Sequence, residues 1–176
     1  MNRLFTKRIQ KELAICRRDN FTYPNLYVRP LESDLKKWYF LVYNLVDTDF
    51  DGGVYFGVMT LPDEYPIKAP DFKFFTPNGR FETGRKICTD FTAFHQSSYS
   101  SSQTIVTMLH GVVSFMTDPQ FDSDGRVIND TTGVGGIKTD SATKKQLAAK
   151  SIAWNKSDPL YQSVFGDFNV TTLTGT

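Results

Sequence analysis

Cys88 is the residue whose type and surroundings best suit covalent chemistry. It follows Arg85 and Lys86 in a stretch, residues 76–102, that shows no helix or strand periodicity, so we expect a long ordered loop. A thiol on a loop beside cationic side chains is more accessible and ionises more readily, which favours a nucleophile. A lone cysteine is also commonly an inert buried side chain, and these residues alone leave the two interpretations evenly balanced.

Two histidines are candidate bases for such a thiol. His110 falls among Leu109, Val112 and Val113 at helical spacing, which favours a packed histidine. His95 lies seven residues past Cys88 in the same loop and could approach the thiol, although a structural or surface role is the larger expectation. No papain-like or caspase-like signature surrounds Cys88, which disfavours a protease.

Composition limits the other classes of function. The 176 residues suit one domain, and a hydrophobic fraction of 40% is sufficient for a buried core. A formal charge of +1 argues against nucleic acid as a partner. Two cysteines without a CxxC pair disfavour a disulfide framework or a structural zinc site. No signal peptide and no run of ~20 apolar residues is found, so we expect a soluble intracellular domain.

The first element that must position these residues is a helix over residues 3–16. Its apolar side chains recur at helical spacing, and Cys16 falls on their side, where packing alone explains it. Over residues 1–18, six basic groups accompany a single acidic one, Glu12. The asymmetry suits a docking face for an acidic partner or the solvated side of a helix, and composition alone favours the second. The basic residues are Arg3, Lys7, Arg8, Lys11, Arg17 and Arg18.

Strand-like patterns follow, and their short connections favour an antiparallel meander. A turn at residues 51–53 separates the second strand from the third, and a proline-rich stretch from Pro62 to Pro77 excludes a helix. The predicted strands are Leu26 to Val28, Trp38 to Leu45, Val54 to Leu61 and Phe72 to Phe75.

Helical spacing returns after the loop. Residues 103–116 predict a helix that packs against the sheet, with the serines at 100–102 as candidate N-caps. Residues 118–139 predict a glycine-rich connector. Residues 141–154, capped by Ser141 or Asp140, predict a further helix, and residues 160–165 one short turn.

Four motifs in a fixed order resemble the ubiquitin-conjugating enzyme family, from about Arg3 to about Phe165. Most members carry His-Pro-Asn before their cysteine, at a shorter interval. Thr in place of His, and an interval of ten positions from Asn78 to Cys88, are similar to the branch that is usually tethered to the endoplasmic reticulum by a C-terminal helix. The motifs are residues 51–56 (DGGVYF), 61–70 (LPDEYPIKAP), 76–81 (TPNGRF) with Ile87-Cys88, and 147–155 (LAAKSIAWN).

The resemblance implies an α+β catalytic domain over residues 1–168, followed by a polar tail over residues 169–176. The domain would hold an N-terminal helix, a four-stranded antiparallel meander, the active-site loop, and central and C-terminal helices. Cys88 would accept ubiquitin as a thioester from the activating enzyme and pass it to a substrate lysine, or to a hydroxyl group, with a RING-type ligase. No metal or cofactor is implied, because the energy resides in the thioester.

The resemblance also assigns roles around the thiol. Asn78 would donate to the negative charge that develops on the carbonyl oxygen, a contact worth on the order of 3 kcal/mol in acyl-transfer enzymes. Its alternative is an Asx-turn residue that supports the loop, and both remain open. Asp122, Ser123 and Asp124 are candidates for activating the acceptor, and each also suits a solvated turn.

Two surfaces are implied for partners. Lys7, Arg8 and Lys11 would dock the activating enzyme, while Ile67 and the serine-rich loop containing Ser101 would meet the ligase. Tyr99 and Gln103 stand where the branch tends to have tryptophans, so the choice of ligase is expected to differ. Replacing His by Thr76 removes a hydrogen-bonding residue, which we expect the longer loop to tolerate.

The resemblance places the chain in the cytoplasm, within the ATP-dependent conjugation pathway of protein degradation. It would lie at the cytosolic face of the endoplasmic reticulum if the natural chain has a C-terminal anchor, which the sequence to Thr176 does not include. The alternatives are a non-catalytic binding module of the same fold, a thiol hydrolase using Cys88 and His95, and a scaffold role for the C-terminal helices.

Overall fold

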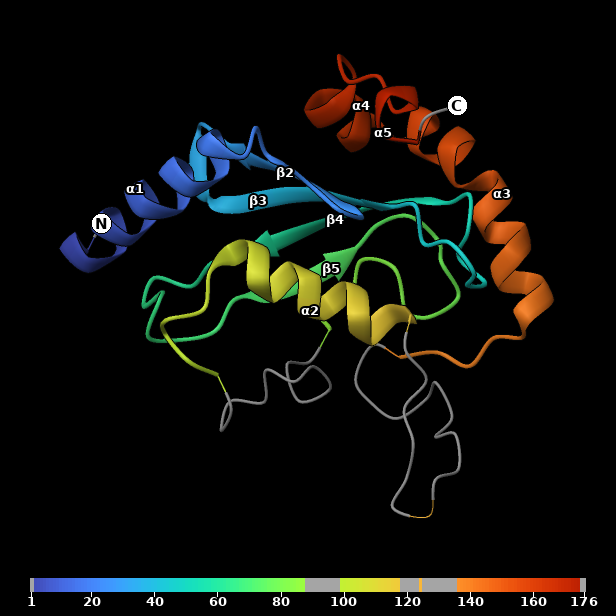
Figure 1. The fold of residues 1–176 in the computed structure, drawn as a ribbon, viewed down its shortest axis with the longest axis horizontal. Helices are drawn as coiled ribbons and strands as arrows, with labels where there is room; N and C mark the ends of the chain where they lie inside the picture. The colour runs from blue at the N-terminus through green and yellow to red at the C-terminus, as the bar shows by residue number, and fades with distance from the viewer. Residues whose placement is uncertain (1, 88–98, 118–123, 125–135, 175–176) are drawn as a thin grey trace.

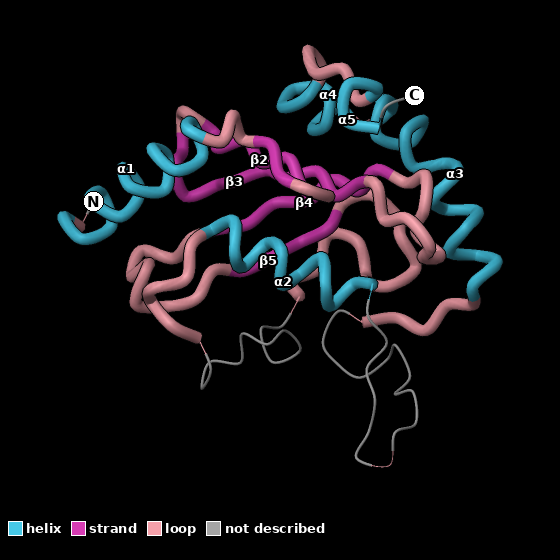
Figure 2. The backbone as a smooth tube through the Cα atoms, in the orientation of Figure 1, coloured by secondary structure: helices cyan, strands magenta, loops and turns pink. Residues whose placement is uncertain are grey.

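The protein is a five-stranded antiparallel sheet with helices on both faces. The computed structural model describes residues 2–87, 99–117, 124 and 136–174. After α1 (Arg3–Arg18), the strands are β1 (Thr22–Tyr23), β2 (Leu26–Leu31), β3 (Asp34–Tyr43), β4 (Val54–Thr60) and β5 (Asp71–Phe74). They pair in chain order as a meander (Figures 1 and 2). The predicted α+β class and antiparallel meander are confirmed.

The four predicted strands are β2 to β5, and β1 is an addition that the sequence pattern does not predict. It is only two residues long and pairs Thr22 with Tyr27 and Tyr23 with Leu26. β2 runs three residues beyond the predicted end, because Arg29 and Pro30 still pair with β3 before a register shift at Leu31. A two-residue strand carries too little alternation to be recognised from sequence.

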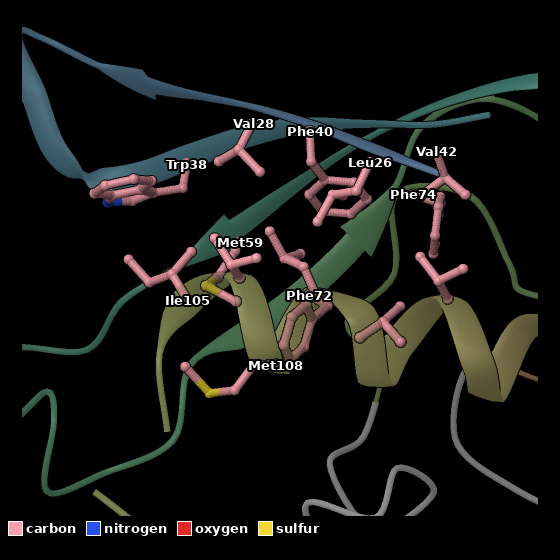
Figure 3. Close-up of a cluster of buried hydrophobic side chains, with 14 of the residues drawn as sticks. Leu26, Val28, Trp38, Phe40, Val42, Met59, Phe72, Phe74, Ile105 and Met108 are labelled. Carbon is pink, nitrogen blue, oxygen red and sulfur yellow. The ribbon is translucent and has the colours of Figure 1, made fainter. Parts of the chain in front are cut away.

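One face of the sheet packs against α2 (Ile105–Thr117), as predicted (Figure 3). Alternate residues of β3 point to this face because side chains alternate along a strand. α2 begins two residues later than predicted, and its cap is Thr104 rather than a serine at 100–102, since Thr104 Oγ1 accepts from Thr107 N at 3.1 Å. The labelled side chains of this core are Leu26, Val28, Trp38, Phe40, Val42, Met59, Phe72, Phe74, Ile105 and Met108.

The opposite face packs against the C-terminal helices (Figure 1). α3 (Ser141–Ser157) is capped by Asp140, whose side chain accepts from Thr143 N at 2.7 Å. α4 (Pro159–Phe165) buries Tyr161 and Phe165 over the sheet. α5 (Thr171–Thr174) falls within the predicted polar tail. The residues on the sheet side of this second core are Tyr39, Leu41, Tyr43, Val54, Phe56 and Val58.

Arg29 of β2 contacts α4 and the residues that follow it. Arg29 Nη1 donates to the carbonyl oxygen of Val164 at 2.5 Å and to Asp167 Oδ1 at 2.8 Å. Its guanidinium also lies over the ring of Phe165, 5.2 Å from the centroid, and over that of Phe168 at 5.8 Å. Arg29 thereby joins β2 to the C-terminal segment on the sheet face opposite α2.

α1 buries Ile9 and Cys16 as predicted, together with Phe5, whereas Leu4 on the predicted apolar side is 45% exposed. The Cys16 side chain is fully buried, and that burial raises the pKa of its thiol to about 11. Because only the thiolate is an effective nucleophile, Cys16 is a packing residue.

Candidate active site

The loop that leads to Cys88 is anchored by Thr76, immediately after β5. Its hydroxyl accepts a hydrogen bond from Phe56 N at 2.8 Å and donates one to Asn155 Oδ1 at 2.6 Å. Thr76 is fully buried. The expectation that replacing His by Thr76 removes a hydrogen-bonding residue is therefore wrong, because the Thr76 hydroxyl itself bonds to β4 and α3.

Two polar residues of α3 complete this anchor. Asn155 Nδ2 donates to the carbonyl oxygen of Val54 at 2.9 Å, and Ser151 Oγ accepts from Val54 N at 2.9 Å. Ser151 Oγ also donates to the carbonyl oxygen of Ala148 at 2.7 Å. The two uncharged polar residues of the 147–155 motif, Ser151 and Asn155, thus contact the start of β4, and every group in the network is neutral.

Asn78 is buried and bonded to its own loop. Its Nδ2 donates to the carbonyl oxygen of Thr76 at 3.0 Å, while its Oδ1 accepts from the backbone N–H groups of Arg80 and Phe81, each at 2.8 Å. These are the contacts of an Asx-turn residue that fixes a tight turn. The geometry supports the loop-support role, and the oxyanion role stays a prediction.

The residues after Asn78 tie the loop to its surroundings. Arg80 is 4% exposed, and its guanidinium lies near two rings that stack on each other, 4.9 Å from the centroid of Phe81 and 4.7 Å from that of Phe115 on α2. Its carbonyl oxygen accepts from Ile137 N at 3.0 Å. Arg80 and Phe81 therefore shape the loop, as the sequence suggests.

The residue directly before Cys88 is fixed at the edge of the sheet. Ile87 is buried and donates its N–H to the carbonyl oxygen of Phe72 at 2.8 Å. The two expected cationic neighbours have carboxylate partners, Arg85 with Glu82 at 2.8 Å and Lys86 with Asp71 at 2.9 Å. These exposed pairs offset part of the positive charge that the sequence places before the thiol.

A groove of about 500 Å³ lies beside Asn78, between the loop and the start of α3. Pro77, Phe81 and Thr83 line one side, and Thr139 and Leu147 line the other. Gly79 adopts φ +80° here, a conformation that favours glycine, and a Cβ atom would meet Lys144 and Thr139. The groove runs along the part of the loop that precedes Cys88.

Several predicted site residues lie outside the described residues, namely Cys88, His95, Asp122 and Ser123. Asp124 is described and exposed. His110 is half-buried on α2, with Nε2 3.2 Å from the carbonyl oxygen of Pro24 and its ring edge-on to Tyr23, which agrees with a packed histidine.

The predicted dock on α1 divides into exposed and engaged residues. Lys7 and Lys11 are exposed. Arg8 has only 12% of its side chain exposed, because its guanidinium bonds to Glu12 Oε1 at 2.8 Å and to the carbonyl oxygens of Ser101 and Gln103. The docking role remains a prediction, and the structure leaves Lys7 and Lys11 as its accessible members.

The predicted ligase surface is formed by two neighbouring loops. Ile67 is 65% exposed, and Ser101 is exposed in the second loop. Tyr99, which replaces an expected tryptophan, is half-buried and donates its hydroxyl to the carbonyl oxygen of Pro66 at 2.6 Å. Beneath them, Tyr65 and Glu12 are fully buried and hydrogen-bonded. Sequence reasoning missed Glu12, although an acidic residue on so basic a helix was a usable signal.

The described residues contain no cluster of three histidine, cysteine or acidic side chains able to hold a metal ion. Among the same residues, no helix is long and apolar enough to cross a membrane.

Comparisons with known proteins place this geometry in a family. The family model for "Ubiquitin-conjugating enzyme" matches residues 8–130. The chain is 33% identical over 163 residues to ubiquitin-conjugating enzyme E2 34 of Arabidopsis thaliana, covering 92% of this chain and 63% of the relative. It is 31% identical over 160 residues to ubiquitin-conjugating enzyme E2 J2 of Mus musculus, covering 91% of this chain and 57% of the relative.

A solved structure supports the fold. Human ubiquitin-conjugating enzyme E2 G1 superposes with a TM-score of 0.54 at 23% identity, covering 63% of this chain and 93% of that structure. The chain spans between 57% and 63% of the length of the first curated relatives it matches. A family model that matches most of the domain, and relatives along nearly the whole chain, decide the assignment. This chain belongs to the ubiquitin-conjugating enzyme family.

Proposed function

We propose that the chain is a ubiquitin-conjugating enzyme that carries ubiquitin as a thioester on Cys88. The observation that carries the proposal is the anchored loop before the thiol, with Thr76 fixed to β4 and α3 and Ile87 fixed to β5. A cysteine suits this reaction because it is both a nucleophile and a leaving group. The loop would hold it in one place while a large acyl group enters and leaves.

The reaction has two steps of the same kind. The Cys88 thiolate attacks the thioester carbonyl of ubiquitin on the activating enzyme and releases that enzyme's thiolate. A substrate amine then attacks the new thioester, loses its proton, and releases the Cys88 thiolate. Asp122, Ser123 and Asp124 are the candidate groups to accept that proton, and Asn78 would support the loop with or without a contact to the oxyanion.

Charging tests the carrier. Wild type incubated with activating enzyme, ubiquitin and ATP should give a thiol-sensitive adduct on non-reducing gels. Cys88→Ser should give a thiol-resistant adduct or none, and the control Cys16→Ala should charge like wild type because Cys16 is buried. Failure of wild type to charge with several activating enzymes and modifiers would favour a non-catalytic binding module.

Discharge tests the acceptor and its activation. The charged protein should lose ubiquitin to free lysine, and parallel reactions with serine and threonine would reveal hydroxyl transfer. Replacing Asp122, Ser123 and Asp124 one at a time by Ala should slow lysine discharge about 10²-fold or more at the residue that accepts the proton. If all three variants discharge to lysine at the wild-type rate, none of these residues accepts the proton.

We further propose partners and a location. Lys7 and Lys11 would meet an acidic surface of the activating enzyme, and Ile67 with Ser101 would meet a RING-type ligase. Location at the endoplasmic reticulum, and a role in protein degradation, rest on the resemblance of the Thr76-Pro77-Asn78 region to the tethered branch. Fractionation of cells that express the full-length natural protein would test the location, and a wholly cytosolic distribution would contradict it.

A further inference from the structure

Glu12 is a buried carboxylate that gathers donors from three separate segments. Its Oε1 accepts from Arg8 Nε at 2.8 Å and from the Tyr65 hydroxyl at 2.9 Å. Its Oε2 accepts from Ile105 N, the first amide of α2, at 3.2 Å. Glu12 itself is 0% exposed. One side chain of α1 therefore contacts both a surface loop and the start of the central helix.

The donors around Glu12 suit a carboxylate. Burying a carboxylate costs free energy unless charged or strong donors surround it, and here an arginine, a phenol and a helix N-terminus do so. Burial raises the pKa of the Tyr65 hydroxyl above its usual range, so this group remains a donor. A glutamine at position 12 keeps the shape, but it offers one acceptor oxygen and turns an NH₂ group toward a donor.

Arg8 extends the contact to a second surface loop. Its Nη1 donates to the carbonyl oxygen of Ser101 at 2.6 Å, and its Nη2 donates to that of Gln103. The guanidinium also lies over the Tyr65 ring, 5.6 Å from the centroid. Because Tyr99 bonds to Pro66, the loops are joined at their surface as well as beneath it.

We propose that Glu12 is a positioning residue that sets the relative placement of the two surface loops, residues 62–68 and 99–104, and through them the response to a ligase. The proposal rests on the proposed function. Glu12 is buried, so it would act on the exposed Ile67 and Ser101 through its contacts with Tyr65 and Arg8. Lys7 and Lys11 are exposed on α1, whereas Glu12 is buried, so we expect charging and ligase response to be separable.

Hydrogen exchange tests the placement without ubiquitin. In Glu12→Gln, amide exchange at Ile67, Lys68 and Gln103 should rise about ten-fold, because these loop amides open locally, while the β3 and β4 amides should change only by the factor that the loss of global stability sets. The control Glu32→Gln makes the same chemical change at an exposed position and should leave all amides unchanged. Loop amides that exchange at the wild-type rate in Glu12→Gln would overturn the proposal.

Discharge kinetics test the consequence. The charged protein is mixed with free lysine and a titrated RING domain that accelerates wild type. In Glu12→Gln, the RING concentration for half-maximal acceleration should rise about ten-fold, while charging and unassisted discharge stay within about two-fold of wild type. Tyr65→Phe, which removes one donor and keeps the carboxylate, should raise this half-maximal RING concentration by a smaller factor.

The two experiments fail in distinguishable ways. A half-maximal concentration that stays at the wild-type value overturns the positioning role, as does an equal fall of charging and unassisted discharge. Failure of wild type to charge overturns the proposed function instead, and hydrogen exchange still decides whether Glu12 places the loops.

Discussion

Two buried polar networks hold the loops of this protein, and they differ in charge. The network around Thr76 joins the loop before Cys88 to α3 through hydroxyl, amide and backbone groups, all of them neutral. The network around Glu12 joins the surface loops to α1 and α2 through a carboxylate and a guanidinium. Each connects residues more than fifty positions apart with hydrogen bonds of ordinary length.

The difference teaches where replacement is tolerated. In a neutral network a lost partner leaves one polar group unsatisfied, and removing both partners of a pair can be nearly neutral. In a charged network the loss of one partner leaves a buried charge, which is far more costly. We therefore expect the loop before Cys88 to tolerate paired substitution, and the Glu12 network to resist any change of charge.

The largest effect should come from the charged network. Glu12→Gln should lower the free energy of unfolding by about 3 kcal/mol, because Arg8 keeps its charge with only 12% of its side chain exposed. Urea unfolding followed by circular dichroism measures it, with Glu32→Gln as the control. A loss below about 1 kcal/mol would show that the charge of Glu12 adds no more stability than a neutral hydrogen bond.

The next effect should come from the neutral network. Asn155→Ala should cost about 2 kcal/mol, since the Thr76 hydroxyl loses its acceptor and the Val54 carbonyl loses a donor. The same urea titration applies. A loss larger than that of Glu12→Gln would reverse the ranking of the two networks.

A double-mutant cycle sharpens the comparison within the neutral network. Thr76→Val alone should cost about 1 to 2 kcal/mol because Phe56 N loses its acceptor. Combined with Asn155→Leu, the loss should be smaller than the sum of the single losses by about 1 kcal/mol, because both members of the pair are then apolar. Strict additivity would show that the two side chains do not stabilise each other.

The smallest effect should come from the N-terminal cap of α3, which belongs to neither network. The hydrogen bonds of the Asp140 cap to Thr143 hold the pKa of this carboxyl below its usual value of 3.8. A depressed pKa means that the cap stabilises the folded state at neutral pH and that this contribution is lost as the pH falls through the folded-state pKa. Asp140→Ala should therefore be less stable than wild type at pH 7, and the gap should close in acid. A gap independent of pH would contradict the charged cap.

Much of the fold could be predicted from the sequence because its signals are local. Trp38, Phe40 and Val42 alternate with Tyr39 and Leu41, which predicts a strand buried on one face or both. The family resemblance also predicted the order of the helices and strands, and the family assignment is confirmed. The start of α2 was predicted at the serines because these are good caps, but Glu12 and Thr104 satisfy its first amides instead.

The site was less predictable because its contacts are distant in sequence. Thr76 meets Asn155 across 79 positions, and Glu12 meets Tyr65 across 53, so no local pattern reveals either pair. Asn78 was predicted as an Asx-turn residue or an oxyanion donor, and its local bonds support the first. Burial of Arg8 follows from the position of residues 101–103, which the helix pattern does not contain.

The clasp between Arg29 and α4 has a mechanical consequence. Tension applied at Thr171 would load the Arg29 contacts to Val164 and Asp167 before it reached α3. Because the Asp167 side chain is exposed and exposed ion pairs are weak, we expect the Arg29 contacts to break first and α4 then to separate from the sheet. In an optical trap we expect a short early extension from this separation, followed by rupture of the sheet. Early rupture of the Arg29 contacts would thus leave Thr76 and the loop before Cys88 in place while the C-terminal helices extend.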